Sequence, residues 1–532
     1  MSGAELAAAS EQRGWRLRAR AREWRGVLLG CVGLVLVSLP FVPRFGAPGS
    51  EMDEGALLAY AGRVQHGAIP WRDFQTFYGP GNVWLLGAVT KVFGVSVATE
   101  RSVGLLYRLG IVVALFLIAR RFGAVAAGLA VAVSVLLLAG EGIAALALYG
   151  SLAFGLVGLA LLVGAVARPD GRRRNLQLVA AGALFAGALL IRFDFLAAVV
   201  LPAAVLLPLV SWRERGRALL GFAVVLAAYI PLLALVGPAK LGRLVHQLLA
   251  TEPGRRLPYP PPDKFPGNFL AASIAATVLL IAVGGVLALR RRRDLEARIL
   301  LAGGLFSLGV LPTTLSRSDH SHVIPGSVVS LALLGSLVTV LVRRMRARKP
   351  GALVPLCCYA VALALCAGSV AMLFGGGLVM LKPVLELDRL HSYDVSVDGR
   401  SFPLSSPLTA ADVQGVVSAA DRLAKPGDSL FVGPIDLRLT NYNDAYIYYL
   451  LPKLRPASFY MEMNPQTANR PGSGLANDLR KADWLILTLR YDLWLEPNSS
   501  TRRGSTEPGR VVRSHFCTRS IDGLYALLQR CK

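Results

Sequence analysis

Two adjacent carboxylates are the first side chains in the sequence whose type and position suggest chemistry. Asp53 and Glu54 follow the first long apolar run, residues 27–42. A charged side chain so close to a membrane span adds little stability, which suggests that it has a function. Residues 54–66 have helical character, so Asp53 is expected at or beside the start of a short helix. An Asp there can act as an acid or base, or simply cap the helix by accepting a backbone N–H bond. The residues alone leave both roles open.

Further polar side chains gather between the later apolar runs. Residues 71–78 mix aromatic and charged groups, although aromatic residues are also usual at a membrane interface. Arg192 and Asp194 can bind a ligand or pair with each other, and Glu141 can be reactive or a solvated loop charge. The candidate residues of these segments are Arg63, Arg72, Asp73, Tyr78, Glu141, Arg192 and Asp194.

A third cluster contains Arg317, Asp319, His320 and His322. Two histidines two residues apart, with one carboxylate, are a weak metal-binding pattern. Hydrogen bonding to a phosphate group is an equally good interpretation of the same side chains. Charged groups at membrane depth are costly, so we expect a functional role for this cluster.

The elements that position these residues are long apolar segments. The chain has 532 residues, of which 54% are hydrophobic and 17% are charged. This composition predicts a polytopic α-helical membrane protein with about eleven transmembrane helices. The predicted spans are residues 27–42, 103–119, 124–139, 147–167, 176–191, 195–210, 219–236, 269–289, 299–315, 323–342 and 353–380.

Basic residues indicate the orientation of these spans. The net charge of +24 comes largely from short Arg-rich connections that alternate with acid-containing ones, which is typical of cytoplasmic loops rather than of a nucleic-acid-binding face. Residues 1–26 are therefore predicted to be a basic cytoplasmic N-terminus, residues 27–381 a transmembrane domain, and residues 43–101 its first outer loop. We expect that loop to contain two interfacial helices, at 54–66 and 80–93. The acids and histidines described above then share the outer face of a plasma membrane.

Residues 382–532 have the composition of a small soluble domain outside the membrane. Strand-like runs at 429–432 and 484–489 and a helical stretch at 409–424 predict an α/β or α+β fold. Its aromatic and amide residues at 441–449 suit sugars or a hydrophobic core equally well. Cys517 and Cys531 can pair if the domain is extracytoplasmic.

The pattern of the first outer loop resembles that of a known superfamily. An acidic pair after the first span, Arg63, Gly67-x-x-Pro70-x-Arg72-Asp73-Phe74 and Gly79-Pro80-Gly81 are similar to the first outer loop of GT-C glycosyltransferases. These polytopic enzymes use polyprenyl-phosphate sugars and include protein O-mannosyltransferases, aminoarabinose transferases and actinobacterial arabinosyltransferases. The resemblance continues at 192–194 and 317–322 and covers roughly the first 380 residues.

The resemblance implies the transfer of a sugar from a polyprenyl-phosphate donor to a cell-envelope glycan, lipid or protein, with inversion of the sugar's configuration. Asp53 would be the general base, and Glu54 would share that role or bind acceptor or metal. A divalent cation, Mg or Mn, is left open as a cofactor. The implied donor-phosphate ligands are Arg63, Arg72, Arg192, Arg317 and His322, and the implied supporting or acceptor residues are Asp73, Tyr78, Glu141, Asp194, Asp319 and His320.

A transporter or flippase of a lipid-linked saccharide is the alternative function. Such proteins usually carry ionisable groups near the bilayer midplane in broken, repeated helices. Here the spans are nearly free of charge and the ionisable groups collect at one face. This distribution favours the enzyme.

Overall fold

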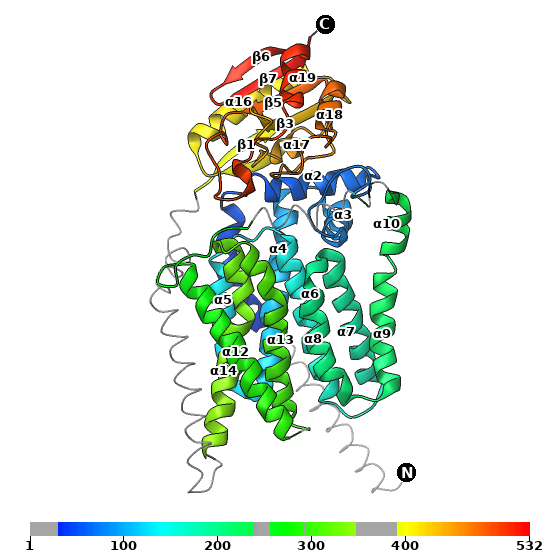
Figure 1. Ribbon diagram of the computed structural model, residues 1–532, viewed down its shortest axis with the longest axis vertical. Coiled ribbons are helices and arrows are strands. Elements are labelled where there is room, and N and C mark those ends of the chain that lie inside the picture. The colour runs from blue at the N-terminus through cyan, green and yellow to red at the C-terminus, as the bar shows by residue number, and fades with distance from the viewer. Residues whose placement is uncertain are drawn as a thin grey trace, which may run out of the picture. The chain divides into compact units, whose positions relative to one another are not determined.

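A computed structural model describes residues 30–238, 240, 242, 256–291, 293–346 and 391–531 (Figure 1). The chain divides into two compact units, Met1–Val42 and Pro43–Lys532. The first unit is helical from Gly30 onward. The predicted cytoplasmic segment 1–26 and the predicted span 353–380 lie outside the described residues.

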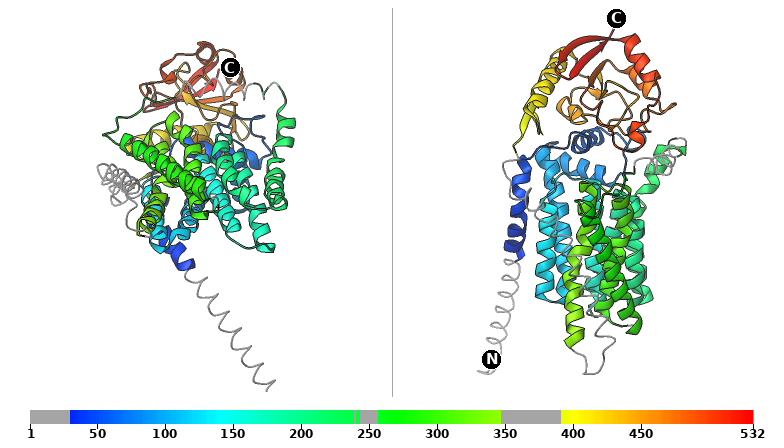
Figure 2. Two further views of the ribbon diagram at one scale, coloured as in Figure 1. Left: turned by 60° about the horizontal axis from the view of Figure 1, so that its bottom comes forward. Right: turned by 60° about the vertical axis from the view of Figure 1, so that its left-hand side comes forward.

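Long apolar helices make up the first part of the second unit, and Figure 2 shows them side by side in cyan to green. Seven helical segments of the described residues are long and apolar enough to cross a membrane. Every predicted span within the described residues is helical, so a multi-pass helical protein is confirmed, whereas the count of about eleven spans stays a prediction. The helices are α4 (Val97–Ala119), α5 (Ala124–Ala139), α6 (Ala147–Val166), α7 (Arg172–Ile191), α8 (Leu196–Leu206), α9 (Trp212–Leu226), α10 (Tyr229–Val236), α12 (Gly267–Arg290), α13 (Leu295–Ser316) and α14 (His320–Arg346), with short 3-10 turns η1 (Leu39–Gly46), η2 (Arg120–Phe122), η3 (Phe193–Phe195) and η4 (Leu207–Leu209).

Local sequence explains where several of these helices begin and how closely they pack. Ser96 caps α4 by accepting a bond from the backbone N–H of Thr99, and Asp294 caps α13 in the same way. Helix α7 packs against α9 at Gly182, where an added Cβ would lie 1.9 Å from the carbonyl oxygen of Ala218. Small residues allow such close contacts between membrane helices.

Residues 43–101, the predicted first outer loop, contain two helices, as predicted. They are α2 (Asp53–Gln65) and α3 (Gly81–Phe93). Ala56, Leu58 and Tyr60 of α2 belong to one buried cluster with residues of the C-terminal part of the chain, such as Phe402 and Tyr446. Helix α2 is therefore packed against the C-terminal domain, and its position at the membrane surface stays a prediction.

The C-terminal part contains a mixed five-stranded sheet with helices. The strand order is β4-β3-β5-β7-β6, in which β3 pairs with β4 and β5 in parallel, while β7 pairs with β5 and β6 in antiparallel fashion. A separate hairpin of β1 and β2 turns at Asp398 and Gly399, both of which have positive φ. The elements are β1 (Tyr393–Val397), β2 (Arg400–Leu404), α16 (Pro407–Leu423), β3 (Ser429–Pro434), α17 (Tyr446–Leu450), β4 (Arg455–Pro456), α18 (Leu475–Lys481), β5 (Trp484–Thr488), η8 (Ser499–Thr501), α19 (Glu507–His515), β6 (Phe516–Asp522) and β7 (Tyr525–Arg530).

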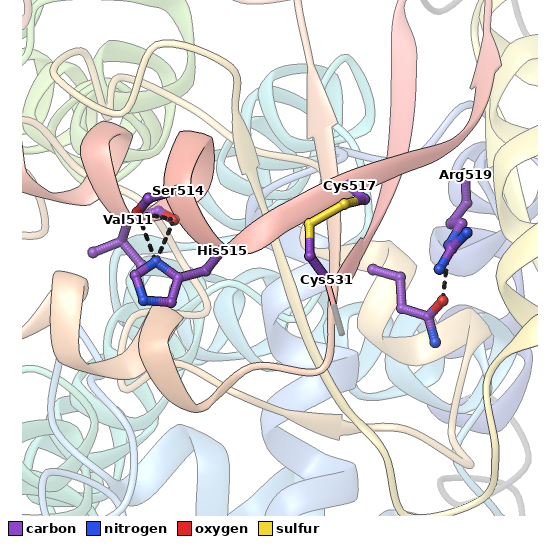
Figure 3. Close-up of a disulfide and its surroundings, with 7 residues drawn as sticks. Val511, Ser514, His515, Cys517, Arg519 and Cys531 are labelled. Carbon is purple, nitrogen blue, oxygen red and sulfur yellow. Dashed lines mark hydrogen bonds between the residues drawn. A yellow bond between two sulfur atoms is a disulfide. The ribbon is translucent and has the colours of Figure 1, made fainter.

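A disulfide between Cys517 and Cys531 joins β6 to the end of β7 (Figure 3). The pairing left open by the sequence is thus present. Nearby, Arg519 donates to the side chain of Gln529 across the same pair of strands, and His515 ends α19.

Candidate active site

Asp53 is the first residue of α2, and its surroundings fix the turn that carries it. Ser50 Oγ donates to Asp53 Oδ2 at 3.1 Å, and Tyr442 Oη lies 3.5 Å from Ser50 Oγ. The same tyrosine oxygen accepts a bond from the backbone N–H of Met52 at 3.3 Å. Met52 and Glu54 are buried, whereas Asp53 is exposed. Of the two neighbouring carboxylates at the start of α2, only that of Asp53 is therefore exposed.

Two cavities meet at Asp53. The smaller cavity has a volume of about 420 Å³ and is lined mainly by α2, α6 and the connections beside them. The larger has a volume of about 800 Å³ and lies between α2, the start of α14 and the C-terminal domain. The residues that line both cavities are Asp53, Phe77, Tyr78, Arg192, Ser321, His322 and Glu462.

Glu54 lines only the smaller cavity and is held in an ion pair. Arg101 donates to both of its carboxylate oxygens, at 2.7 and 3.0 Å, and the two side chains are almost fully buried. Arg101 also donates to the carbonyls of Phe45 and Ala47, so the pair ties residues 45–47 to α4. At Gly104 of α4 an added Cβ would lie 1.7 Å from the carbonyl oxygen of Ile143, which brings the Glu141 loop against the same helix.

Arg192 and Asp194 form the pair that the sequence allowed, and Arg192 lines both cavities while Asp194 lines the larger. The guanidinium donates to both oxygens of Asp194, at 3.0 and 2.5 Å, and lies 4.3 Å from the ring centre of Tyr78. Thr313 of α13 also donates to Asp194. These contacts orient Arg192, whose role toward phosphate stays a prediction.

The 317–322 cluster is divided among several partners. Arg317 binds Glu496 of the C-terminal domain at 2.5 Å and Asp319 at 3.3 Å. Burial opposes ionisation of Asp319, but the bonds from His322 (2.7 Å) and Arg317 outweigh it and lower the pKa of Asp319. His320 instead lies 3.0 Å from Glu141. Arg317, Asp319 and His320 line the larger cavity, and Glu141 lines the smaller.

This arrangement does not form a metal centre. In the part of the chain that the structure describes, no group of three or more His, Cys, Asp or Glu side chains could hold a metal ion. The two histidines take different carboxylates as partners, as described above. No such group is therefore seen among the described residues, and a divalent cation stays a prediction to which no step is assigned.

Arg63, Arg72 and Asp73 are not brought to Asp53. Arg72 pairs with Asp73 at 2.7 Å, and this hydrogen bond is the main cause that lowers the pKa of Asp73. Asp73 also accepts a bond from the backbone N–H of Ile69, while Arg63 lies 5.6 Å from the ring centre of Phe74. All three side chains stabilise the turn after α2, and neither cavity includes them in its lining.

The C-terminal domain supplies cavity residues that sequence reasoning missed. Glu462, like Asp53, lines both cavities and accepts a bond from Tyr60 Oη of α2 at 3.2 Å. Of the set at 441–449, Asn441 and Tyr442 line the larger cavity, whereas the later tyrosines belong to the core. The other residues of the domain that line this cavity are Asn464, Pro465, Trp494, Glu496, Asn498 and Ser500.

A buried ion cluster joins this domain to Glu51, two residues before the start of α2. Arg490 binds Glu51 at 2.6 Å and Asp444 at 3.2 Å, and Tyr491 and Tyr525 donate to Asp444 at 2.6 and 2.7 Å. We call Glu51, Asp444 and Arg490 the clamp. Burial raises the pKa of Asp444 to about 6, although Arg490 and the two tyrosines oppose the shift.

The pKa of Asp444 predicts a pH dependence of stability. Its folded value of about 6 exceeds its ordinary value of 3.8, so its contribution is fully present below pH 4 and is lost as the pH rises through 6. The total is about 3 kcal/mol, at 1.36 kcal/mol per pKa unit. We expect the stability of Asp444→Asn, followed by thermal unfolding in detergent, to fall less than that of the parent between pH 4 and 6. Equal slopes for the two proteins would contradict this assignment.

Comparison with known proteins gives similarity only among solved structures. Neither a family model nor a curated protein matches the chain. Two structures of ArnT from Cupriavidus metallidurans, one bound to undecaprenyl phosphate and one in the apo state, are similar at 14% and 13% identity. They cover 94% and 96% of this chain and 97% and 98% of their own, each with a TM-score of 0.47. The Archaeoglobus fulgidus oligosaccharyltransferase, in a complex with Zn and sulfate, is similar at 12% identity over 92% of this chain and 72% of its own, with a TM-score of 0.46.

Proposed function

We propose that the protein is a membrane glycosyltransferase of the GT-C type that moves a sugar from a polyprenyl-monophosphate donor to an acceptor hydroxyl. The observation that supports this most is the position of Asp53. Its exposed carboxylate lies where the two cavities meet, together with the cationic or hydrogen-bonding side chains of Arg192 and His322. One cavity can hold the donor and the other the acceptor, with the base between them.

The reaction that this geometry supports is a single displacement. Asp53 takes the proton of the acceptor hydroxyl while the hydroxyl oxygen attacks the anomeric carbon. The bond from that carbon to the phosphate oxygen breaks, polyprenyl phosphate leaves, and the configuration of the sugar is inverted. Arg192 and His322 lie where they can donate hydrogen bonds to the departing phosphate, which carries the developing negative charge.

The two cavities suit different substrates. The lining of the smaller includes apolar side chains of the membrane helix α6, such as Ala147 and Leu148, which fit a lipid-linked donor. The larger is bounded by the C-terminal domain, which we place outside the cytoplasm. The alternating Arg-rich connections and the Cys517–Cys531 disulfide support that location.

The experiment that tests this function is a transfer assay with the purified full chain in detergent. A panel of synthetic polyprenyl-monophosphate sugars is incubated with glycan, lipid and peptide acceptors of the cell envelope. We expect one donor to yield free polyprenyl phosphate and a glycosylated acceptor in equal amounts. Consumption of no donor by a folded protein, across all acceptors, would contradict the proposal.

A further inference from the structure

An aromatic cluster forms one wall of the larger cavity. The ring of Tyr442 lies 4.6 Å from that of Trp494 and 4.8 Å from that of Tyr491, measured between ring centres. Tyr491 is buried, whereas 49% of the surface of Trp494 is exposed. The two tyrosines therefore support an indole ring that has a large open surface at the cavity wall.

The loop that carries Trp494 is held in place by side-chain hydrogen bonds. Asn441 Nδ2 donates to the carbonyl of Tyr491 at 3.0 Å and also to that of Trp494. Farther along, Asn498 Nδ2 donates to Glu496 at 2.7 Å, and Ser500 Oγ accepts from the backbone N–H of Glu496 at 2.8 Å. An aromatic surface fixed in this way loses little conformational entropy when a ligand packs on it.

The remaining lining of this wall is polar without a large net charge. Amide groups of Asn441, Asn464 and Asn498 line the cavity, and the carboxylate of Glu496 is balanced by Arg317. Aromatic rings beside amides and paired charges match a sugar, which presents an apolar face of C–H groups and a rim of hydroxyls. A volume of about 800 Å³ lies within the usual range of ligand sites.

The aromatic wall is also directly connected to Asp53. Trp494 contacts Tyr442, Tyr442 Oη lies 3.5 Å from Ser50 Oγ, and Ser50 Oγ donates to Asp53 at 3.1 Å. Trp494 and Asp53 thus line the same cavity and are linked through only two intervening side chains.

We propose, building on the transferase function above, that this wall is the acceptor subsite and that its acceptor is a glycan. One sugar ring stacks on Trp494, and the hydroxyl to be glycosylated points toward Asp53. The carboxylate of Glu496, which lines the same cavity, accepts a hydrogen bond from another hydroxyl group of that ring.

The test is direct glycan binding to the full chain in detergent, without donor, by saturation-transfer NMR. The probes are methyl glycosides of disaccharides of mannose, galactose, glucose and arabinofuranose. We expect at least one probe to bind the parent, Trp494→Ala to weaken that binding about tenfold or more, and Trp494→Phe to retain most of it. The matched control is Leu493→Ala, because this neighbouring side chain is 97% exposed and lines neither cavity.

Binding of no glycan probe, equal binding by Trp494→Ala, or binding of a Ser/Thr-rich peptide in place of every glycan would overturn this inference. Because binding needs no turnover, Asp53→Asn should still bind the glycan. Retained Trp494-dependent binding without transfer from any donor would contradict the proposed function alone. Transfer to a lipid or peptide with no glycan binding would contradict the acceptor subsite alone.

Discussion

Asp53→Asn is expected to lower the rate of sugar transfer by about 10²–10⁴-fold while the protein remains folded. The amide cannot take a proton from the acceptor hydroxyl. It can still accept the bond from Ser50 Oγ, and it is a suitable residue at the start of a helix. The loss therefore reflects chemistry rather than the position of α2. The measurement is initial transfer rate with the active donor, together with thermal unfolding of each variant.

Asp398→Asn is the matched control for this substitution. Asp398 is exposed in the turn between β1 and β2, and Asn tolerates its positive φ. Its transfer rate should equal that of the parent. If Asp53→Asn retained the parent rate, Asp53 would be a helix-start residue only and another group would have to supply the base.

Arg490→Met is expected to have the largest effect on stability. It leaves Asp444, which has 0% exposure, and the mostly buried Glu51 without their cation. Removing one partner of a buried ion pair costs about 3–5 kcal/mol. For a domain of this size the unfolding temperature should fall by roughly 10 °C. Differential scanning of the full chain in detergent measures this change.

The pH dependence separates the clamp from a general packing defect. Protonated Asp444 needs no cation, so the loss of stability in Arg490→Met should be smaller at pH 5 than at pH 7. The double variant Arg490→Met/Asp444→Asn should regain part of the stability that Arg490→Met loses. Arg480→Met is the control, since Arg480 pairs with Glu507 on the surface and such pairs contribute about 0–1 kcal/mol. A loss that is independent of pH, or one no greater than that of the control, would contradict the role of the clamp.

The helices of the membrane part could be predicted because length and apolar composition are local properties of the sequence. The predicted span at 103–119, for example, lies inside α4, which begins at Val97. The prediction missed the first turn because Glu100 and Arg101 are charged. Both side chains are nevertheless buried, because Arg101 binds Glu54 and Glu100 accepts a bond from the backbone N–H of Ala145. Hydropathy counts both residues as polar, since it takes no account of partners supplied by the fold.

The site could be predicted only in part, because some of its contacts come from tertiary packing and leave no local pattern in the sequence. Asp53, Arg192 and His322 follow or precede apolar runs, so their placement on one face could be inferred from the alternation of spans. Arg72 and Asp73 were expected beside them. These neighbouring side chains of opposite charge instead pair with each other and line neither cavity. Glu462 and Trp494 reach the site from more than 400 residues away through the packing of α2 on the C-terminal domain, and no local pattern marks such a contact.

Sealed vesicles that contain the purified protein and a polyprenyl-monophosphate sugar labelled in its sugar distinguish the transferase from a transporter. With a glycan acceptor outside the vesicles, we predict that the label appears on the acceptor in a new glycosidic bond and that Asp53→Asn abolishes this transfer. Passage of the intact labelled donor to the opposite leaflet, with its phosphate bond unbroken, would contradict the transferase function and identify the protein as a transporter of the lipid-linked sugar.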